Sequence, residues 1–371
     1  MKRKQQLVAL AIAAAVSAPA FADTANVTIY GIASASVDST NNGEVRTNKV
    51  SSNATRIGFK GVEDLGNGLK ALWQVESQIN IDDSTGNTFA SRNSFVGLAS
   101  DDVGTIELGR NDTPYKTATR RLDLFADTLG DNRSLLGSVA GRSALVAFDG
   151  RENNSVNYIS PTFSGITLSA AYVASAETAT TSADKKGNLW SLAGQYEGKF
   201  DTNSLFFSAS WERHKLGSAG TGTLASTTPD ASESAWKLGL GYKLGSAFDL
   251  SAIYEKTSDN EGAGGADRYG HSAYYLAGKY TFGDGSDDIK LAYSRAGDLA
   301  GAANSSARHV SLGYDHNLSK RTTLYALYTK LYNSDGIAYA LGAAGWTTGN
   351  TAAGANGDDP SAISLGIKHS F

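Results

Sequence analysis

The sequence predicts an all-β protein, a transmembrane barrel of sixteen antiparallel strands, and three observations lead to this fold class. Apolar and polar residues alternate along much of the chain, as in strands with one dry and one wet face. The connections between these segments are short at one end and long at the other. Beyond the N-terminus, no segment approaches the roughly 18 continuous apolar residues that a membrane-spanning helix requires.

The first 22 residues have the order of a secretory signal peptide. Three basic residues at positions 2–4 precede an apolar run over 7–16, and Ala20-Phe21-Ala22 stands before Asp23. A charged, then apolar, then small-residue order is typical of a segment that is cleaved after export. We therefore expect residues 23–371 to form one exported β-barrel domain.

The composition excludes several classes of function. The chain has no cysteine, which excludes disulfides, thiolate metal sites and cysteine nucleophiles. Removal of residues 1–22 takes away three of the 33 basic residues and leaves 30 against 37 acidic ones, a net charge of about −7. An acidic exported chain is not expected to bind nucleic acid. The five histidines form no HExxH pair, and GxSxG and Walker motifs are absent, so we expect neither an enzyme nor a bound metal or other cofactor.

The alternation of apolar and polar residues defines the strands. In residues 236–244, for example, Trp236, Leu238 and Leu240 alternate with lysine and glycine. A soluble β-sandwich shows the same period, so alternation alone leaves both folds open. We expect sixteen strands, which start near these residues: Asn26, Asn53, Leu69, Ser91, Thr105, Asn154, Ile166, Leu189, Ser204, Ser234, Leu250, His271, Ile289, Arg308, Thr322 and Ser361.

The lengths of the connections favour the membrane barrel. Short turn-like pieces, such as 201–203 and 245–246, alternate with long polar stretches, such as 258–270 and 333–360. This asymmetry is typical of outer-membrane barrels, with short periplasmic turns and long external loops. An even number of strands lets the last pair with the first, which removes the free edges that lipid cannot hydrate.

Several motifs, in one order along the chain, resemble the trimeric general diffusion porins of Gram-negative bacteria. These motifs lie at residues 27–31, 56–70, 92–98, 109–114, 154–158 and 318–325. The resemblance implies a homotrimer in the outer membrane, in contact with lipid and lipopolysaccharide, that lets small hydrophilic solutes and ions diffuse passively through its water-filled lumen. Three alternatives stay open: a substrate-specific outer-membrane channel, a surface adhesin and a soluble exported β-protein.

The resemblance also implies that the third long loop, residues 111–150, folds into the barrel and narrows it. It assigns Arg56, Arg92 and Arg151 to a basic cluster on the wall, and strand parity places Lys60 on the same face as Arg56. Opposed charges across such a waist select solutes through a transverse field. The loop carries acids that we expect either to face this wall or to be ordinary solvated loop residues: Asp112, Asp123, Asp127 and Asp131. Basic residues in the loop nearly balance these acids, so the sequence leaves the ion preference open.

Overall fold

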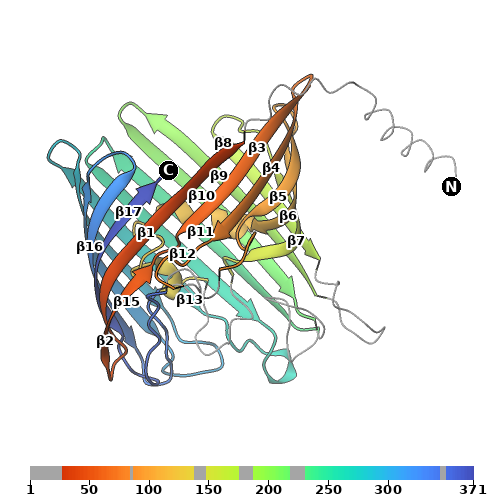
Figure 1. The fold of residues 1–371 in the computed structure, drawn as a ribbon. Helices are drawn as coiled ribbons and strands as arrows, with labels where there is room; N and C mark the ends of the chain where they lie inside the picture. Colours follow the sequence, from red (N-terminus) through yellow and green to blue (C-terminus); the bar gives the residue numbers. More distant parts are fainter. Residues whose placement is uncertain (1–26, 84–86, 138–147, 175–186, 218–229, 343–347) are drawn as a thin grey trace.

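The computed structural model describes residues 27–83, 87–137, 148–174, 187–217, 230–342 and 348–371, which form one closed β-barrel (Figure 1). Neighbouring strands are antiparallel all round the ring, and β1 closes it by pairing with β17. No helix among these residues is long and apolar enough to cross a bilayer. The predicted signal peptide, residues 1–22, lies outside the described residues.

The strands have these bounds: β1 Thr28–Asn41, β2 Arg46–Ser52, β3 Arg56–Gly66, β4 Leu69–Gln78, β5 Ser94–Ser100, β6 Gly104–Asp112, β7 Arg151–Ile159, β8 Ile166–Ala174, β9 Asn188–Phe200, β10 Asn203–Lys215, β11 Ser232–Leu244, β12 Phe248–Asp259, β13 Ser272–Phe282, β14 Asp287–Ala296, β15 Ala307–Asn317, β16 Thr322–Asn333 and β17 Ser361–Ser370. Both β2 and β3 pair with β1, so they are two parts of one interrupted strand. The barrel therefore has the predicted sixteen strands.

The interruption between β2 and β3 is a feature that the sequence did not reveal. We expected this strand to begin near Asn53, whereas it begins at Arg46 and breaks at residues 53–55. Ala54 has a φ of +50° at the break. The amide of Asn53 donates to Ser36 Oγ at 2.8 Å and to Tyr325 Oη at 3.0 Å, which holds the bend against the inner wall.

The two faces of the wall are sorted as the alternation predicted. On β11, Trp236 and Leu240 point outward and are 42% and 47% exposed, while Lys237 points inward and is 1% exposed. Apolar residues on the outside and polar residues inside are the arrangement of a barrel that spans lipid. A β-sandwich is excluded, because the described strands form one sheet that closes on itself.

Turns and loops lie at opposite ends of the barrel. Short turns such as 67–68 and 201–202 join the strands at the upper end in Figure 1, and the longer loops lie at the lower end. The first of these external connections, residues 42–45, is a tight turn, because β2 continues the hairpin with β1. The external loop after β12 contains the short helix η4, Ala263–Gly265.

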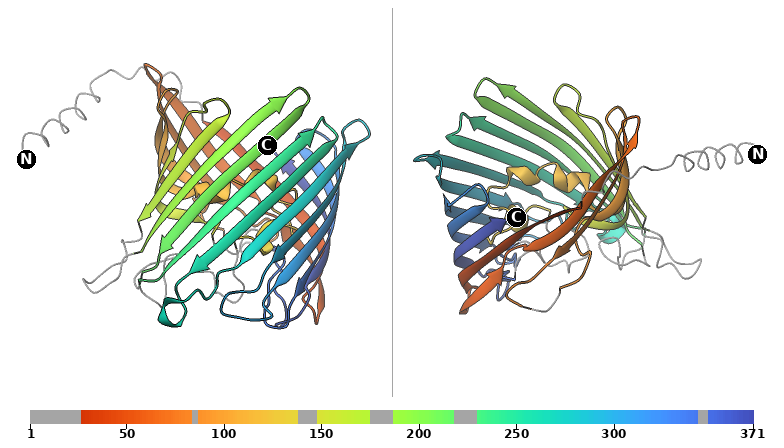
Figure 2. Two further views of the ribbon diagram at one scale, coloured as in Figure 1. Left: turned by 180° about the vertical axis from the view of Figure 1, so that it is seen from behind. Right: turned by 45° about the horizontal axis from the view of Figure 1, so that its top comes forward.

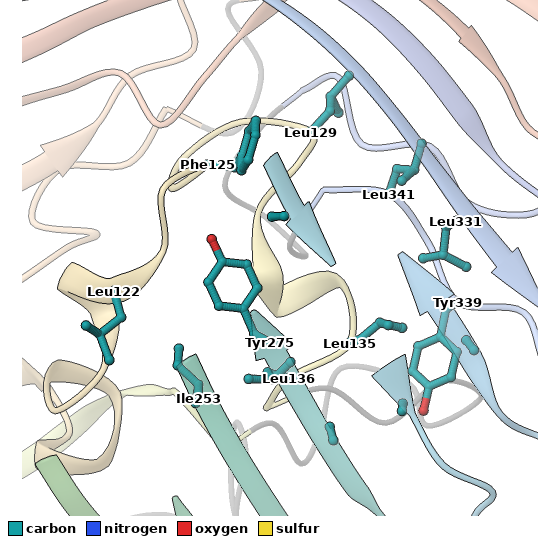
Figure 3. Packing of buried hydrophobic residues seen from close by; sticks show 14 of the residues in the cluster. Leu122, Phe125, Leu129, Leu135, Leu136, Ile253, Tyr275, Leu331, Tyr339 and Leu341 are labelled. Carbon is teal, nitrogen blue, oxygen red and sulfur yellow. The ribbon is translucent and has the colours of Figure 1, made fainter. Parts of the chain in front are cut away.

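The third loop, between β6 and β7, folds into the barrel, as predicted. It contains the short helices α2 (Pro114–Thr117), η1 (Arg120–Leu122) and η2 (Asn132–Ser134), which lie inside the ring of strands in the right-hand view of Figure 2. Its apolar side chains pack against inward-facing residues of β12, β13 and β16 and against the last external loop (Figure 3). The loop contributes Leu122, Phe125, Leu129, Leu135 and Leu136 to this cluster. The loop is therefore attached to one side of the lumen, and the other side stays polar.

Candidate pore constriction

The third loop is attached to the wall through the carboxylate of Glu255 on β12, which is completely buried. Tyr115 Oη, near the start of the loop, donates to Glu255 Oε2 at 2.7 Å. The backbone N–H of Gly137, in the middle of the loop, donates to Glu255 Oε1 at 2.8 Å. Lys237 on β11 lies 3.8 Å from Glu255 and also contacts Asp149 at the end of the loop. One inward-facing carboxylate thus connects distant parts of the loop to one place on the barrel.

The predicted arginines lie on the opposite side of the lumen. Arg56 begins β3, Arg92 precedes β5 and Arg151 begins β7. Burial and the guanidinium groups of Arg151 and Arg56 lower the pKa of Arg92. Arg92 contacts Glu76 on β4, and Arg151 donates to Asn93 Oδ1. These contacts fix the planar guanidinium groups in place, as hydrogen-bonded arginines do generally.

Lys60 lies on the same face of β3 as Arg56, beyond the arginine row. Its side chain is exposed, and Nζ lies 5.1 Å from the centre of the Tyr30 ring. The Tyr30 hydroxyl donates to Glu76 Oε2 at 3.0 Å, so the tyrosine stands between Lys60 and the carboxylate that contacts Arg92.

Two of the four predicted acids contact the arginine row. Asp127, at the tip of the loop, lies 3.1 Å from Arg56 Nη1. Asp112, where the loop leaves β6, lies 3.0 Å from Arg151 Nη2 and 2.7 Å from Lys116 Nζ. Burial lowers the pKa of Lys116 to about 7, although Asp112 opposes the shift.

The other two acids are enclosed within the loop. Asp131 pairs with Arg133 at 2.8 Å and with Arg120 at 3.0 Å. Asp123 accepts the backbone N–H groups of Phe125 at 2.9 Å and Asn132 at 3.1 Å. Burial acts to raise the pKa of Asp131, but Arg120 and Arg133 hold it well below its usual range. These two carboxylates stabilise the fold of the loop instead of facing the arginine row.

A cavity of about 380 Å³ adjoins this row, between the root of the loop and the wall of β4 to β9. Polar side chains such as Gln74, Asn93 and Asn157 line it. Polar walls of this kind favour water and hydrophilic solutes over apolar ones. The cavity is therefore polar and lies beside fixed charges.

The family model described as Gram-negative porin matches residues 9–336. The chain belongs to this porin family. The outer membrane porin protein 32 of Delftia acidovorans is 32% identical over 99% of this chain and 100% of its own length. The major outer membrane protein P.IA of Neisseria meningitidis is 26% identical, again over 99% of this chain and 100% of its own length.

Solved structures have the same fold. An anion-selective porin from Comamonas acidovorans has a TM-score of 0.75 at 28% identity, and the match covers 94% of this chain and 100% of that one. A trimer form of OmpT from Vibrio cholerae has a TM-score of 0.66 at 15% identity, with the same coverage. This porin is thus an outer-membrane channel protein, and its relatives are channel proteins, not enzymes.

Sequence reasoning about this porin missed Glu76 and Glu255, and it counted Arg120 only among the basic loop residues that nearly balance the acids. Strand parity offers a signal for Glu76, because Gln74 and Gln78 flank it on the polar face of β4. Nothing in the local pattern distinguishes Glu255 from other inward polar residues of β12. Arg120 belongs to a loop without regular period, so only the folded loop shows that it contacts Asp123, Asp127 and Asp131.

Proposed function

We propose that solutes pass between the third loop and the arginine row of Arg56, Arg92 and Arg151, and that the channel prefers anions. The proposal depends on the balance of charge between the arginine row and the third loop, the waist of the channel. The ion pairs there join five arginines and Lys116 to five carboxylates, and Lys60 adds a further positive charge nearby. The similarity to a porin described as anion-selective supports the same preference.

The mechanism is selection during passive diffusion. A guanidinium remains charged at every physiological pH, so the arginine row keeps a positive potential along one side of the passage. The loop acids at the waist are already paired with cations, which reduces their attraction for a passing cation. A small hydrophilic anion therefore meets a lower electrostatic barrier than a cation of the same size.

The reversal potential in a KCl gradient across a planar bilayer tests this proposal. Arg56→Ala removes one charge at the waist, which takes about 1 kcal/mol of attraction from an anion and about 1 kcal/mol of repulsion from a cation at roughly 4 Å in water, so the anion-to-cation permeability ratio is expected to fall about thirty-fold. Arg46→Ala is the matched control, because Arg46 is an exposed residue at the tip of the first hairpin. Cation preference in the wild type, or an unchanged ratio in Arg56→Ala, would contradict the proposal.

We also propose that the porin is a homotrimer in contact with lipid and lipopolysaccharide. Ala33 and Ala35 are small residues on the outer face of β1, where a second barrel can approach closely, while Gly31 on the same face is covered by the Phe371 ring. The fold is shared with a protein solved in a trimer form. Chemical crosslinking or native mass measurement in detergent is expected to show trimers, and monomers alone would refute this assembly.

A further inference from the structure

A second cavity, of about 370 Å³, lies beneath the tip of the third loop and does not belong to the arginine row. Residues 123–128 of the loop form one side of it, and the inner wall of β1 and β14 to β17 forms the other. None of Arg56, Arg92 and Arg151 lines it. The turn between β15 and β16 contributes to its edge, so the cavity lies toward the periplasmic end of the barrel.

Four basic side chains from three parts of the chain line this cavity: Lys290 on β14, Lys320 and Arg321 in the turn after β15, and Lys368 on β17. Lys290 is paired with Asp315, whose carboxylate lies 2.7 Å away. Lys320, Arg321 and Lys368 form no ion pair and no side-chain hydrogen bond among the residues that the structure describes, although Asp127 and Asp315 act electrostatically on Lys368. The cavity is thus lined by four basic and three acidic side chains, and three of the four cations form no close ion pair.

The acids of the cavity compensate these charges only in part, because each is also paired with another cation. Asp127 lies 3.1 Å from Arg56 and 2.7 Å from Arg120. Asp123 is enclosed by backbone N–H groups and lies 3.3 Å from Arg120. The remaining lining supplies neutral hydrogen-bonding groups, among them Ser34 and Thr323.

We propose that this cavity binds a small polyvalent oxyanion, for which inorganic phosphate is the simplest representative. Lysine is a common phosphate ligand, and several oxygens on one centre accept hydrogen bonds from ammonium, guanidinium and hydroxyl groups together. A volume of about 370 Å³ corresponds to roughly a dozen water molecules, so the anion fits with part of its hydration shell. A single chloride neutralises only one of the three charges. The inference rests on the proposed function, because the solute reaches the cavity through the lumen.

The test uses the full chain in planar bilayers with symmetric KCl. Inorganic phosphate is added to one side at a time, and the reduction in chloride current is measured as a function of concentration. We expect a saturable reduction at lower phosphate concentration from the periplasmic side than from the external side. Lys368→Gln is expected to raise the half-maximal concentration at least about five-fold, since each negative charge of the anion loses roughly 1 kcal/mol of attraction at about 4 Å.

Two further variants keep the test independent of folding defects. Lys320→Gln changes an exposed turn residue and is expected to weaken the effect of phosphate in the same direction. Lys199→Gln is the matched control, because Lys199 is an exposed lysine at the same end of the barrel that does not line the cavity. Equal effects from both sides, or wild-type behaviour of both Lys368→Gln and Lys320→Gln, overturn the inference.

The reversal potential in KCl without phosphate separates this inference from the proposed function. Cation preference together with a side-dependent phosphate effect overturns the proposed selectivity and supports the oxyanion site. Anion preference without any phosphate effect supports the selectivity and overturns the site.

Discussion

The Glu255 carboxylate provides a sharp test of how the third loop is held in the barrel. In Glu255→Ala, the buried Tyr115 hydroxyl and the Gly137 N–H lose their acceptor. Each buried unsatisfied donor costs about 1–3 kcal/mol, so the loss is about 2–6 kcal/mol. Lys237 keeps its contact with Asp149, so it is not left without an anionic partner.

The free energy lost at Glu255 must be compared with the free energy that the apolar packing of the loop contributes. Five loop side chains belong to the buried cluster in Figure 3. At about 1.5–3 kcal/mol per buried side chain they contribute roughly 8–15 kcal/mol, which exceeds the loss at Glu255. We therefore expect the loop of Glu255→Ala to stay inside the barrel, while the parts near Tyr115 and Gly137 become loose.

Single-channel recording at fixed voltage distinguishes a loosened loop inside the barrel from a loop that has left the lumen. The mean conductance of Glu255→Ala is expected to stay near that of the wild type, and the noise of the open-channel current is expected to increase. Glu255→Gln retains one acceptor oxygen and is expected to show intermediate noise. Wild-type noise in Glu255→Ala refutes the anchoring role of Glu255. A jump to the conductance of an unobstructed barrel shows instead that the apolar packing of the loop is weaker than the hydrogen bonds to Glu255.

Two further predictions concern a buried lysine and the barrel seam. Because burial lowers the pKa of Lys116 to about 7, the folded protein binds fewer protons than the unfolded chain between about pH 7 and the usual lysine value. Its stability relative to Lys116→Met should therefore rise above pH 7, by up to about 1.4 kcal/mol per pH unit in urea unfolding, and a fall would contradict the burial of the charge. A side chain at Gly31 would collide with the ring of Phe371. Gly31→Val should therefore reduce the folded fraction on unheated gels far more than Ala33→Val, and equal effects would exclude this packing.

The sequence was sufficient for most strands because each wall residue faces either lipid or water. The outward Trp236 and Leu240 alternate with inward Lys237, and this period is visible without a structure. The strand β2, Arg46–Ser52, escaped prediction because it is polar at nearly every position. Its hydrogen bonds to β1 make β2 a strand, and the local sequence of β2 does not show which segment will lie beside it.

The inward direction of the wall arginines could be predicted from the sequence, but the contacts of the loop acids could not. Arg56 follows strand parity, so its inward direction could be inferred from the sequence. Asp127 and Asp131 stand in a segment without period, and the sequence treats them alike. The structure separates them, because the loop folds so that Asp131 contacts Arg133 from the same loop while Asp127 reaches Arg56 on the wall.

The pairing of β1 with β17 has a consequence for biogenesis. Ile32 lies opposite Ser370, 338 positions later, and the backbone of Gly31 exchanges hydrogen bonds with Phe371. The loop-closure entropy makes the pairing of such distant segments slow. A barrel in which β1 and β17 are not paired has two edges of unpaired backbone groups, which lipid cannot hydrogen-bond. A nascent polypeptide that lacks its final strand therefore cannot form a stable barrel in the bilayer. Quality control during assembly can act at the β1–β17 junction, because these two strands pair only when every strand between them is in place.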